Sequence, residues 1–185
     1  VGPVCVLCIR RTLAGGRACG LASGLGAATA DALYGLVAGL GLAFVADFLV
    51  GGQGWLRLAG GLFLIYLGAK TFRAAPPAPD AQAKSNARDL ASAYASTFAL
   101  TVTNPLTILS FGVMFAGLGA AGRADGYASA LLLVAGVFLG SAAWWLALSL
   151  AVGALRSKFD SRRMRWVNRA AGLVLAAFGA CVLMQ

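Results

Sequence analysis

The chain has 185 residues, of which 60% are hydrophobic and only 11% are charged. Soluble domains carry about 25% charged residues, so this composition excludes an ordinary water-soluble protein and indicates an all-α polytopic membrane protein. The formal net charge of +9 does not indicate nucleic-acid binding, because the basic residues are confined to short segments between apolar runs.

Six apolar stretches follow one another along the chain. In lipid the backbone must satisfy its own hydrogen bonds, so each stretch is predicted to form a helix. A spanning helix needs roughly 20 residues, and the first stretch is interpreted as a helix that is truncated at its N-terminus. The predicted transmembrane helices cover residues 1–9, 21–44, 58–72, 94–118, 127–155 and 166–184 of a single domain, residues 1–185.

The basic residues favour one side of the membrane. All of the 15 lysines and arginines except Arg57 and Arg123 lie in the first, third and fifth connections or at the adjoining helix ends. The third connection, between the third and fourth predicted helices, is a proline-rich loop at about residues 74–93. Cytoplasmic connections carry an excess of Lys and Arg, so these three are predicted to be cytoplasmic loops of a bacterial inner-membrane protein.

Two segments of the chain match without a gap. "WLRLAGGLFLIYLGA" (residues 55–69) and "WVNRAAGLVLAAFGA" (residues 166–180) share Trp, Ala, Gly, Leu, Leu, Gly and Ala at the same places. Each half has three helices, which is an odd number. The second half therefore enters the membrane from the side opposite to the one at which the first half entered. The sequence therefore predicts two inverted three-helix repeats, at about residues 1–73 and 94–185, a plan common among secondary transporters.

Small and aromatic residues predict packing contacts. Glycines four residues apart let the backbones of membrane helices approach closely. Trp144 and Trp145 lie inside the fifth predicted helix, where a packing role is favoured over stacking on a substrate. The glycine pairs are Gly20–Gly24, Gly35–Gly39 and Gly136–Gly140.

An aspartate, Asp31, lies inside the second predicted helix. A carboxylate in lipid costs at least a few kcal/mol, and such groups usually mark a transport pathway. Asp31 is therefore interpreted either as a group that fastens helices by a hydrogen bond or as a substrate or proton site. Burial disfavours the charged form of a carboxylate, which makes Asp31 a candidate proton carrier.

Several other polar groups are predicted at the same depth. The helical rise of 1.5 Å per residue places Pro3, Tyr66 and the Asn104–Pro105 pair near the midplane of the membrane, with Asp31. Pro105 removes a backbone hydrogen bond from the fourth helix and frees the carbonyl of Thr101. Thr103 adds a hydroxyl beside it, and Tyr34 follows Asp31 on the same helical face. The candidate site therefore comprises Pro3, Asp31, Tyr34, Tyr66, Thr101, Thr103, Asn104 and Pro105.

Two segments resemble a known family. "GPVCVLCIRRTLAGGRACGLASGLGAATADALYG" (residues 2–35) is similar to the N-terminal signature of the LysE/RhtB family of amino-acid exporters, and "TVTNPLTILSFGVMFAGLG" (residues 101–119) resembles its fourth helix. The resemblance implies six helices and export of amino acids or related metabolites by the proton motive force. It departs from the family at Val1, which replaces the first proline of a Pro-Gly-Pro turn, and at Ala30, where glycine is common. The site residues it implies are Gly2, Pro3, Asp31, Asn104 and Pro105.

Two alternative functions remain open at this point. Cys5 and Cys8 have the C-x-x-C spacing of a membrane thiol–disulfide shuttle of the CcdA/DsbD type. A redox thiol needs exposure and an electropositive setting, whereas these cysteines have apolar neighbours, which favours a packing role. A cation exporter would need more intramembrane acids than Asp31. The sequence indicates no cofactor and no metal site; the expected partners are an amino-acid-like substrate and the lipid bilayer, and a homo-oligomer remains open.

Overall fold

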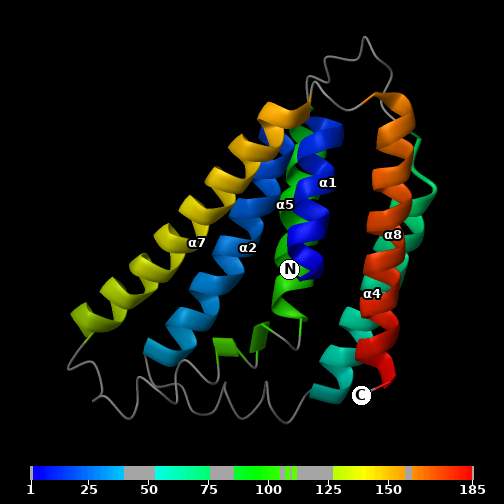
Figure 1. The fold of residues 1–185 in the computed structure, drawn as a ribbon. Helices are drawn as coiled ribbons and strands as arrows, with labels where there is room; N and C mark the ends of the chain where they lie inside the picture. The colour runs from blue at the N-terminus through cyan, green and yellow to red at the C-terminus, as the bar shows by residue number, and fades with distance from the viewer. Residues whose placement is uncertain are drawn as a thin grey trace.

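A computed structural model describes residues 2–39, 53–75, 86–104, 107–108, 110–111, 127–156 and 160–184. Helices dominate these residues, which contain no strand, so the prediction of an all-α protein is confirmed for the described part of the chain. The helices are α1 (Pro3–Gly15), α2 (Arg17–Gly39), α4 (Gln53–Phe72), α5 (Ala87–Val102), α7 (Tyr127–Leu155) and α8 (Ser161–Met184) (Figure 1).

The helices extend beyond the apolar stretches that predicted them. α2 begins at Arg17 and α8 at Ser161, each ahead of its first apolar residue. Polar residues continue a helix without difficulty once it has left the lipid, so hydropathy underestimates its length. For the same reason, the end predicted for the loop at about residues 74–93 is wrong: α5 already begins at Ala87. The backbone N–H of Asn86 donates to the carboxylate of Asp89 at 3.3 Å and caps this helix.

The fourth predicted helix is interrupted in its middle. α5 ends at Val102, and Asn104 is not helical. Asn104 directly precedes Pro105, and the residue before a proline disfavours the helical conformation. Pro105 itself lies outside the described residues. Residues 107–108 are helical again, so the helix is interrupted after Val102.

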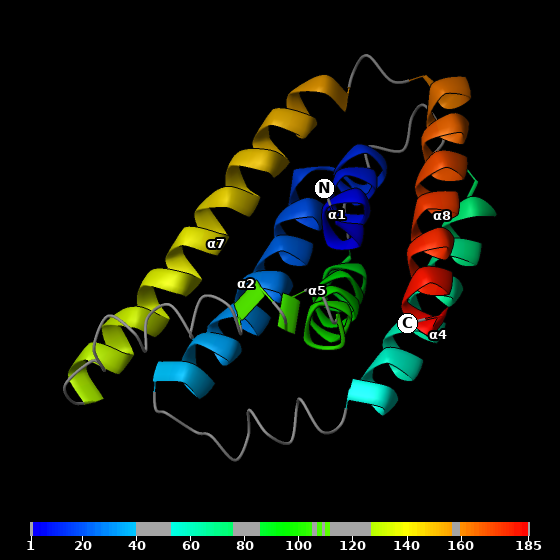
Figure 2. The ribbon, with the colours of Figure 1, turned by 60° about the horizontal axis from the view of Figure 1, so that its bottom comes forward.

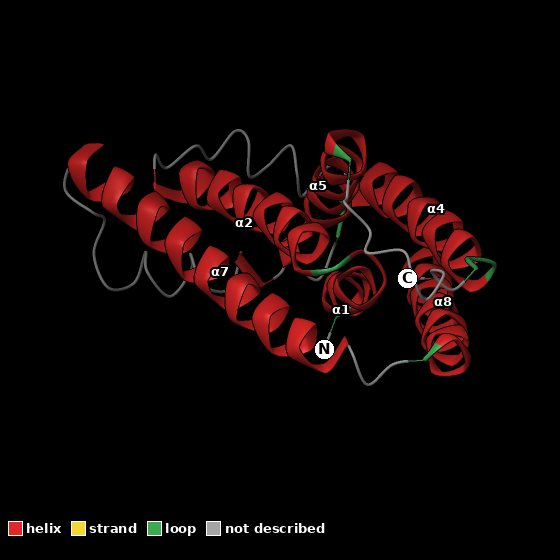
Figure 3. Cartoon of the chain, turned by 90° about the horizontal axis from the view of Figure 1, so that it is seen from above, coloured by secondary structure: helices red, strands yellow, loops and turns green. Residues whose placement is uncertain are grey.

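The helices form a four-helix group and a pair. α1 lies beside α2, α5 and α7 and also packs against α8, and α4 and α8 pack against each other (Figures 2 and 3). Leucines from α1, α4, α5 and α8 form a common core where the group and the pair meet. The fully buried ones are Leu7, Leu64, Leu100 and Leu175.

Backbone contacts join α4 and α8. A Cβ atom added to Gly68 would lie 2.8 Å from the carbonyl oxygen of Gly172, and one added to Gly172 would lie 2.7 Å from that of Gly68. Gly179 is held in the same way against Gly61, at 2.7 Å. Only glycine allows two helices to approach so closely. We call these four residues the glycine seam.

Two features relate the fold to a membrane. The helical segments Ala128–Leu155 and Arg162–Met184 are long and apolar enough to cross a bilayer, and Leu58–Phe72 is a shorter apolar helix. The outer surface of α7 exposes large apolar side chains, among them Leu132 at 74% and Trp144 at 62%. In a membrane, lipid would cover these side chains.

The arginines gather at one end of the bundle, which we call the basic end. α1 and α7 finish there, and α2, α5 and α8 begin there, at the top of Figure 1. This end carries the arginines at the ends of five helices: Arg10, Arg11, Arg17, Arg88, Arg156, Arg162, Arg163 and Arg165.

Candidate functional site

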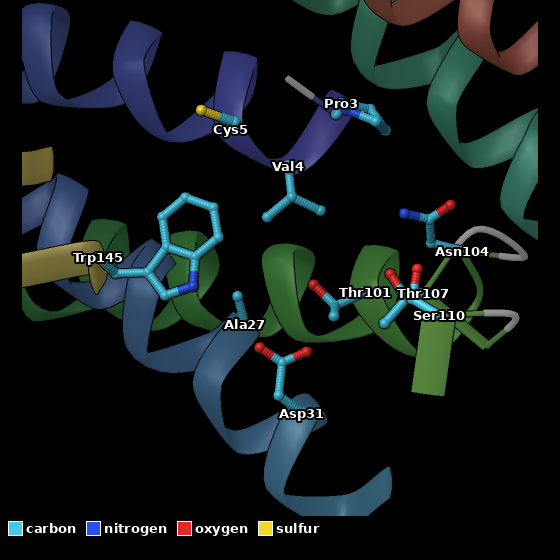
Figure 4. Close-up of a pocket in the computed structure, with 11 residues that line it drawn as sticks. Pro3, Val4, Cys5, Ala27, Asp31, Thr101, Asn104, Thr107, Ser110 and Trp145 are labelled. Atoms are coloured by element: carbon cyan, nitrogen blue, oxygen red, sulfur yellow. The ribbon is translucent and has the colours of Figure 1, made fainter. Parts of the chain in front are cut away.

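A cavity of about 220 Å³ lies where the beginning of α1 meets α2, α5 and α7 (Figure 4). It lies below the basic end, because α1 starts at the cavity and ends at the basic end. The lining residues are Gly2, Pro3, Val4, Cys5, Ala27, Asp31, Thr101, Asn104, Thr107, Ser110 and Trp145.

Asp31 is the acidic residue of this lining. Its Oδ2 atom accepts a hydrogen bond of 2.7 Å from the hydroxyl of Ser141 on α7. The side chain is half-buried, because its carboxyl group also faces the cavity. The two interpretations of Asp31 are therefore not exclusive: it joins α2 to α7 and it presents a carboxylate to an open space.

The beginning of α1 forms the opposite wall of the cavity. Gly2 has an extended backbone, with φ of −90° and ψ of 174°, and Pro3 is the first residue of the helix. Proline suits this position because the first N–H groups of a helix have no partner within it. The positive end of the α1 dipole consequently points toward the cavity.

The end of α5 supplies neutral polar groups. Thr101 is buried, and its hydroxyl donates to the carbonyl of Thr97 at 2.9 Å. Asn104 is 7% exposed and follows the end of the helix, where its side chain lines the cavity. The structure thus brings five of the candidate residues together around one space: Gly2, Pro3, Asp31, Thr101 and Asn104.

Tyr34 and Thr103 lie nearby but do not line the cavity. The hydroxyl of Tyr34 donates to the carbonyl of Val102 at 2.6 Å, and its ring stacks on Phe111 at 5.4 Å. The hydroxyl of Thr103 donates to the carbonyl of Ala99 at 2.8 Å. Both side chains satisfy carbonyls in the last turn of α5, and so they support the segment that carries Asn104.

The structure places Tyr66 away from the site. Its side chain is 58% exposed on the outer face of α4, where its ring stacks with Phe63. The inner face of this helix is formed by Leu64 and Leu67, which are buried. The prediction of a site role for Tyr66 is wrong, because helical rise gives the height of a residue and not the face on which it lies.

Ser141 and Trp145 are among the residues around the cavity that the predicted set of site residues does not contain. Ser141 is a hydroxyl inside an apolar helix, and that contrast was the available signal. Trp145 was interpreted as a packing residue, but its indole also lines the cavity. In the view of Figure 4, Trp145 lies at one side of the lining and Asn104 at the other, with Asp31 between them.

The two cysteines of α1 are not joined in a disulfide. Cys5 lines the cavity, and the buried thiol of Cys8 donates to the carbonyl of Gly20 at 3.3 Å. Within the described part of the chain, no group of three or more His, Cys, Asp or Glu side chains is arranged to hold a metal ion.

Comparisons with known proteins agree on one class. The chain matches the family described as "LysE type translocator" over residues 1–185. It is also similar to the "Putative amino acid efflux protein YcgF" of Bacillus subtilis (strain 168), with 29% identity over 160 residues, 84% of this chain and 75% of the relative. No solved structure matches the chain.

Proposed function

Because the chain belongs to the LysE type translocator family, we propose that it exports amino acids or closely related compounds in exchange for protons. The observation that carries this proposal is the position of Asp31, a carboxylate that lines a cavity between four helices. Family membership favours this function over the thiol–disulfide shuttle and the cation exporter.

The two ends of the cavity suit the two charges of an amino acid. Asp31 can hold an ammonium group, and the indole of Trp145 adds a cation–π surface beside it. The beginning of α1 at Gly2 and Pro3 offers the positive end of a helix dipole to the carboxylate. Thr101 and Asn104 supply neutral hydrogen-bonding groups between these two ends.

In this proposal Asp31 also couples export to protons. An ammonium group and a proton compete for one carboxylate, so the binding of either displaces the other. A proton that arrives from outside releases the substrate, and a substrate that arrives from inside releases the proton. The exchange needs no second acidic residue in the cavity.

Alternating access requires the site to open to either side in turn, and inverted repeats are a common plan for transporters that work in this way. The glycine seam supports such a repeat. In the two matched segments, Gly61 is equivalent to Gly172 and Gly68 is equivalent to Gly179. The contacts pair Gly61 with Gly179 and Gly68 with Gly172. This exchange of partners is what a two-fold axis in the membrane plane produces.

The proposed orientation places the basic end in the cytoplasm. It is tested by single cysteines at Ala87, exposed at the basic end, and at Gly54, exposed at the other end. Both variants are made in a chain without its four native cysteines. An impermeant thiol reagent added to intact cells should label Gly54→Cys and spare Ala87→Cys; the reverse pattern would overturn the orientation.

The function itself is tested with Asp31→Asn in proteoliposomes. Asparagine has nearly the same size and still forms a hydrogen bond with Ser141, but it cannot ionise. Export driven by a pH gradient and substrate counterflow should both be lost. Asp89→Asn, an exposed position at the start of α5, is the matched control and should retain both activities. Wild-type rates in Asp31→Asn would show that Asp31 only fastens α2 to α7.

A further inference from the structure

Arg11 is a partly buried cation whose recorded partners are all neutral. It lies on α1 near the basic end, and its guanidinium joins this helix to α2 and α5. Within the described residues, no carboxylate forms an ion pair with it. Nη1 donates to the hydroxyls of Ser23 at 3.1 Å and Thr97 at 2.8 Å and to the carbonyl of Ala93 at 2.9 Å, and Nη2 donates to the hydroxyl of Ser96 at 2.7 Å.

Among the described residues, this arrangement leaves the charge without a counter-charge. Removing a cation from water costs several kcal/mol, and an opposite charge repays that cost better than neutral oxygens do. Hydrogen bonds between a guanidinium and a carboxylate are shorter and stronger than those to hydroxyls, and they are often bidentate. A carboxylate that reached Arg11 would therefore replace its present partners favourably.

The partners of Arg11 lie one helical turn from the cavity. Ser23 precedes Ala27 by four residues on α2, and Thr97 precedes Thr101 by four residues on α5. Ala27 and Thr101 both line the cavity. Because one turn of helix rises about 5.4 Å, Arg11 lies just above the cavity, between it and the basic end.

On the basis of the proposed function and orientation, we propose that Arg11 is the entry site for the carboxylate group of the substrate. In the described conformation its bonds join α1 to α2 and α5 between the basic end and Asp31. A substrate carboxylate takes over the donors of the guanidinium and releases α5 from α1. The substrate thus favours the open arrangement by its higher affinity for it, and its ammonium group then passes on to Asp31.

The test compares substrates that differ only at the carboxylate. Radiolabelled serine, leucine and lysine are each offered beside the corresponding amide, which keeps the ammonium group and lacks the negative charge. Uptake is measured into inside-out vesicles, so that the basic end faces the added substrate. In the wild-type protein the amino acid should be transported faster than its amide. In Arg11→Gln the amino-acid rate should fall roughly tenfold or more relative to the amide rate, as expected for a lost charged hydrogen bond.

Two further variants keep this test independent of folding. Arg11→Lys retains the charge and should preserve part of the preference for the amino acid. Ser96→Ala removes one neutral partner of Arg11 and should leave the ratio of acid to amide rates unchanged. An equal loss of both rates in a folded Arg11→Gln protein would overturn the inference and leave the proposed function standing. If the wild-type protein moves none of the three amino acids while remaining folded, the proposed function fails and the inference fails with it.

Discussion

The α4–α8 pair relies on close backbone contacts, whereas the four-helix group of α1, α2, α5 and α7 combines such a contact, between Gly26 and the carbonyl of Tyr94, with polar side-chain contacts. In the pair, the glycine seam brings backbone against backbone at separations that no larger residue tolerates. In the group, polar side chains carry many of the contacts: Asp31 with Ser141, Tyr34 with Val102, Tyr94 with Thr29, and Arg156 with the last carbonyls of α1.

This difference suggests that the two regions have different roles in transport. Close backbone packing is lost as soon as two helices separate, and lipid offers nothing to replace it. A hydrogen bond between side chains can instead be exchanged for one to a substrate or to water with little net cost. We infer that the α4–α8 pair is a scaffold and that the four-helix group contains the parts that move. The predictions below test that distinction.

The largest effect is expected in the glycine seam. Gly172→Leu places a side chain against the carbonyl of Gly68 and the backbone of Phe72, so α4 and α8 must separate. Overpacking of this kind costs about 1–3 kcal/mol or more, and we expect a lower yield of monodisperse protein and a lower unfolding temperature in detergent.

Gly136→Leu on α7 is the matched control for that substitution. Nothing lies within 4 Å of a Cβ added at Gly136, so this variant should unfold at the wild-type temperature. Equal destabilisation of the two variants would contradict the assignment of a scaffold role to the glycine seam.

A smaller effect, confined to transport, is expected from Ser141→Ala. The variant removes the donor to Asp31 and leaves the carboxylate in place. A hydrogen bond to a charged group contributes about 1.5–3 kcal/mol, so proton-driven export should fall roughly tenfold or more while the unfolding temperature changes little. Ser141→Thr keeps the hydroxyl and should retain most of the export. Unchanged export in Ser141→Ala would show that Asp31 needs no fixed partner on α7.

The contrast between the two regions also shows what the sequence could predict. The heights of Pro3, Asp31 and Asn104 followed from helical rise alone, and these residues meet at one cavity. The facing direction of Tyr66 did not follow, because it depends on which side of α4 packs inward. The inward residues of α7 were missed because this helix is apolar on all sides, so its hydropathy pattern singles out no face.

Glycine spacing gave a mixed result for a related reason. Gly20 and Gly24 do face close neighbours, Thr12 and Trp145, as the spacing predicted. The pair Gly136–Gly140 has the same spacing, yet a Cβ added at either position meets open space. Spacing identifies a helix face that permits close approach, but only the arrangement of the other helices decides whether a partner lies there.

The smallest effect, and one of opposite sign, is expected at Ser149 on α7. Its side chain is fully buried, and its hydroxyl makes no hydrogen bond within the described part of the chain. It faces Gly20, where an added Cβ would lie 2.8 Å from the Ser149 oxygen. Burying a polar group without a partner costs about 1–3 kcal/mol, so Ser149→Ala should raise the unfolding temperature slightly and leave transport unchanged. Ser149→Ala could instead lower export while the protein stays folded. That result would show that the hydroxyl gains a partner in another conformation. α7 would then move against α1 and α2, as expected if the four-helix group contains the moving parts.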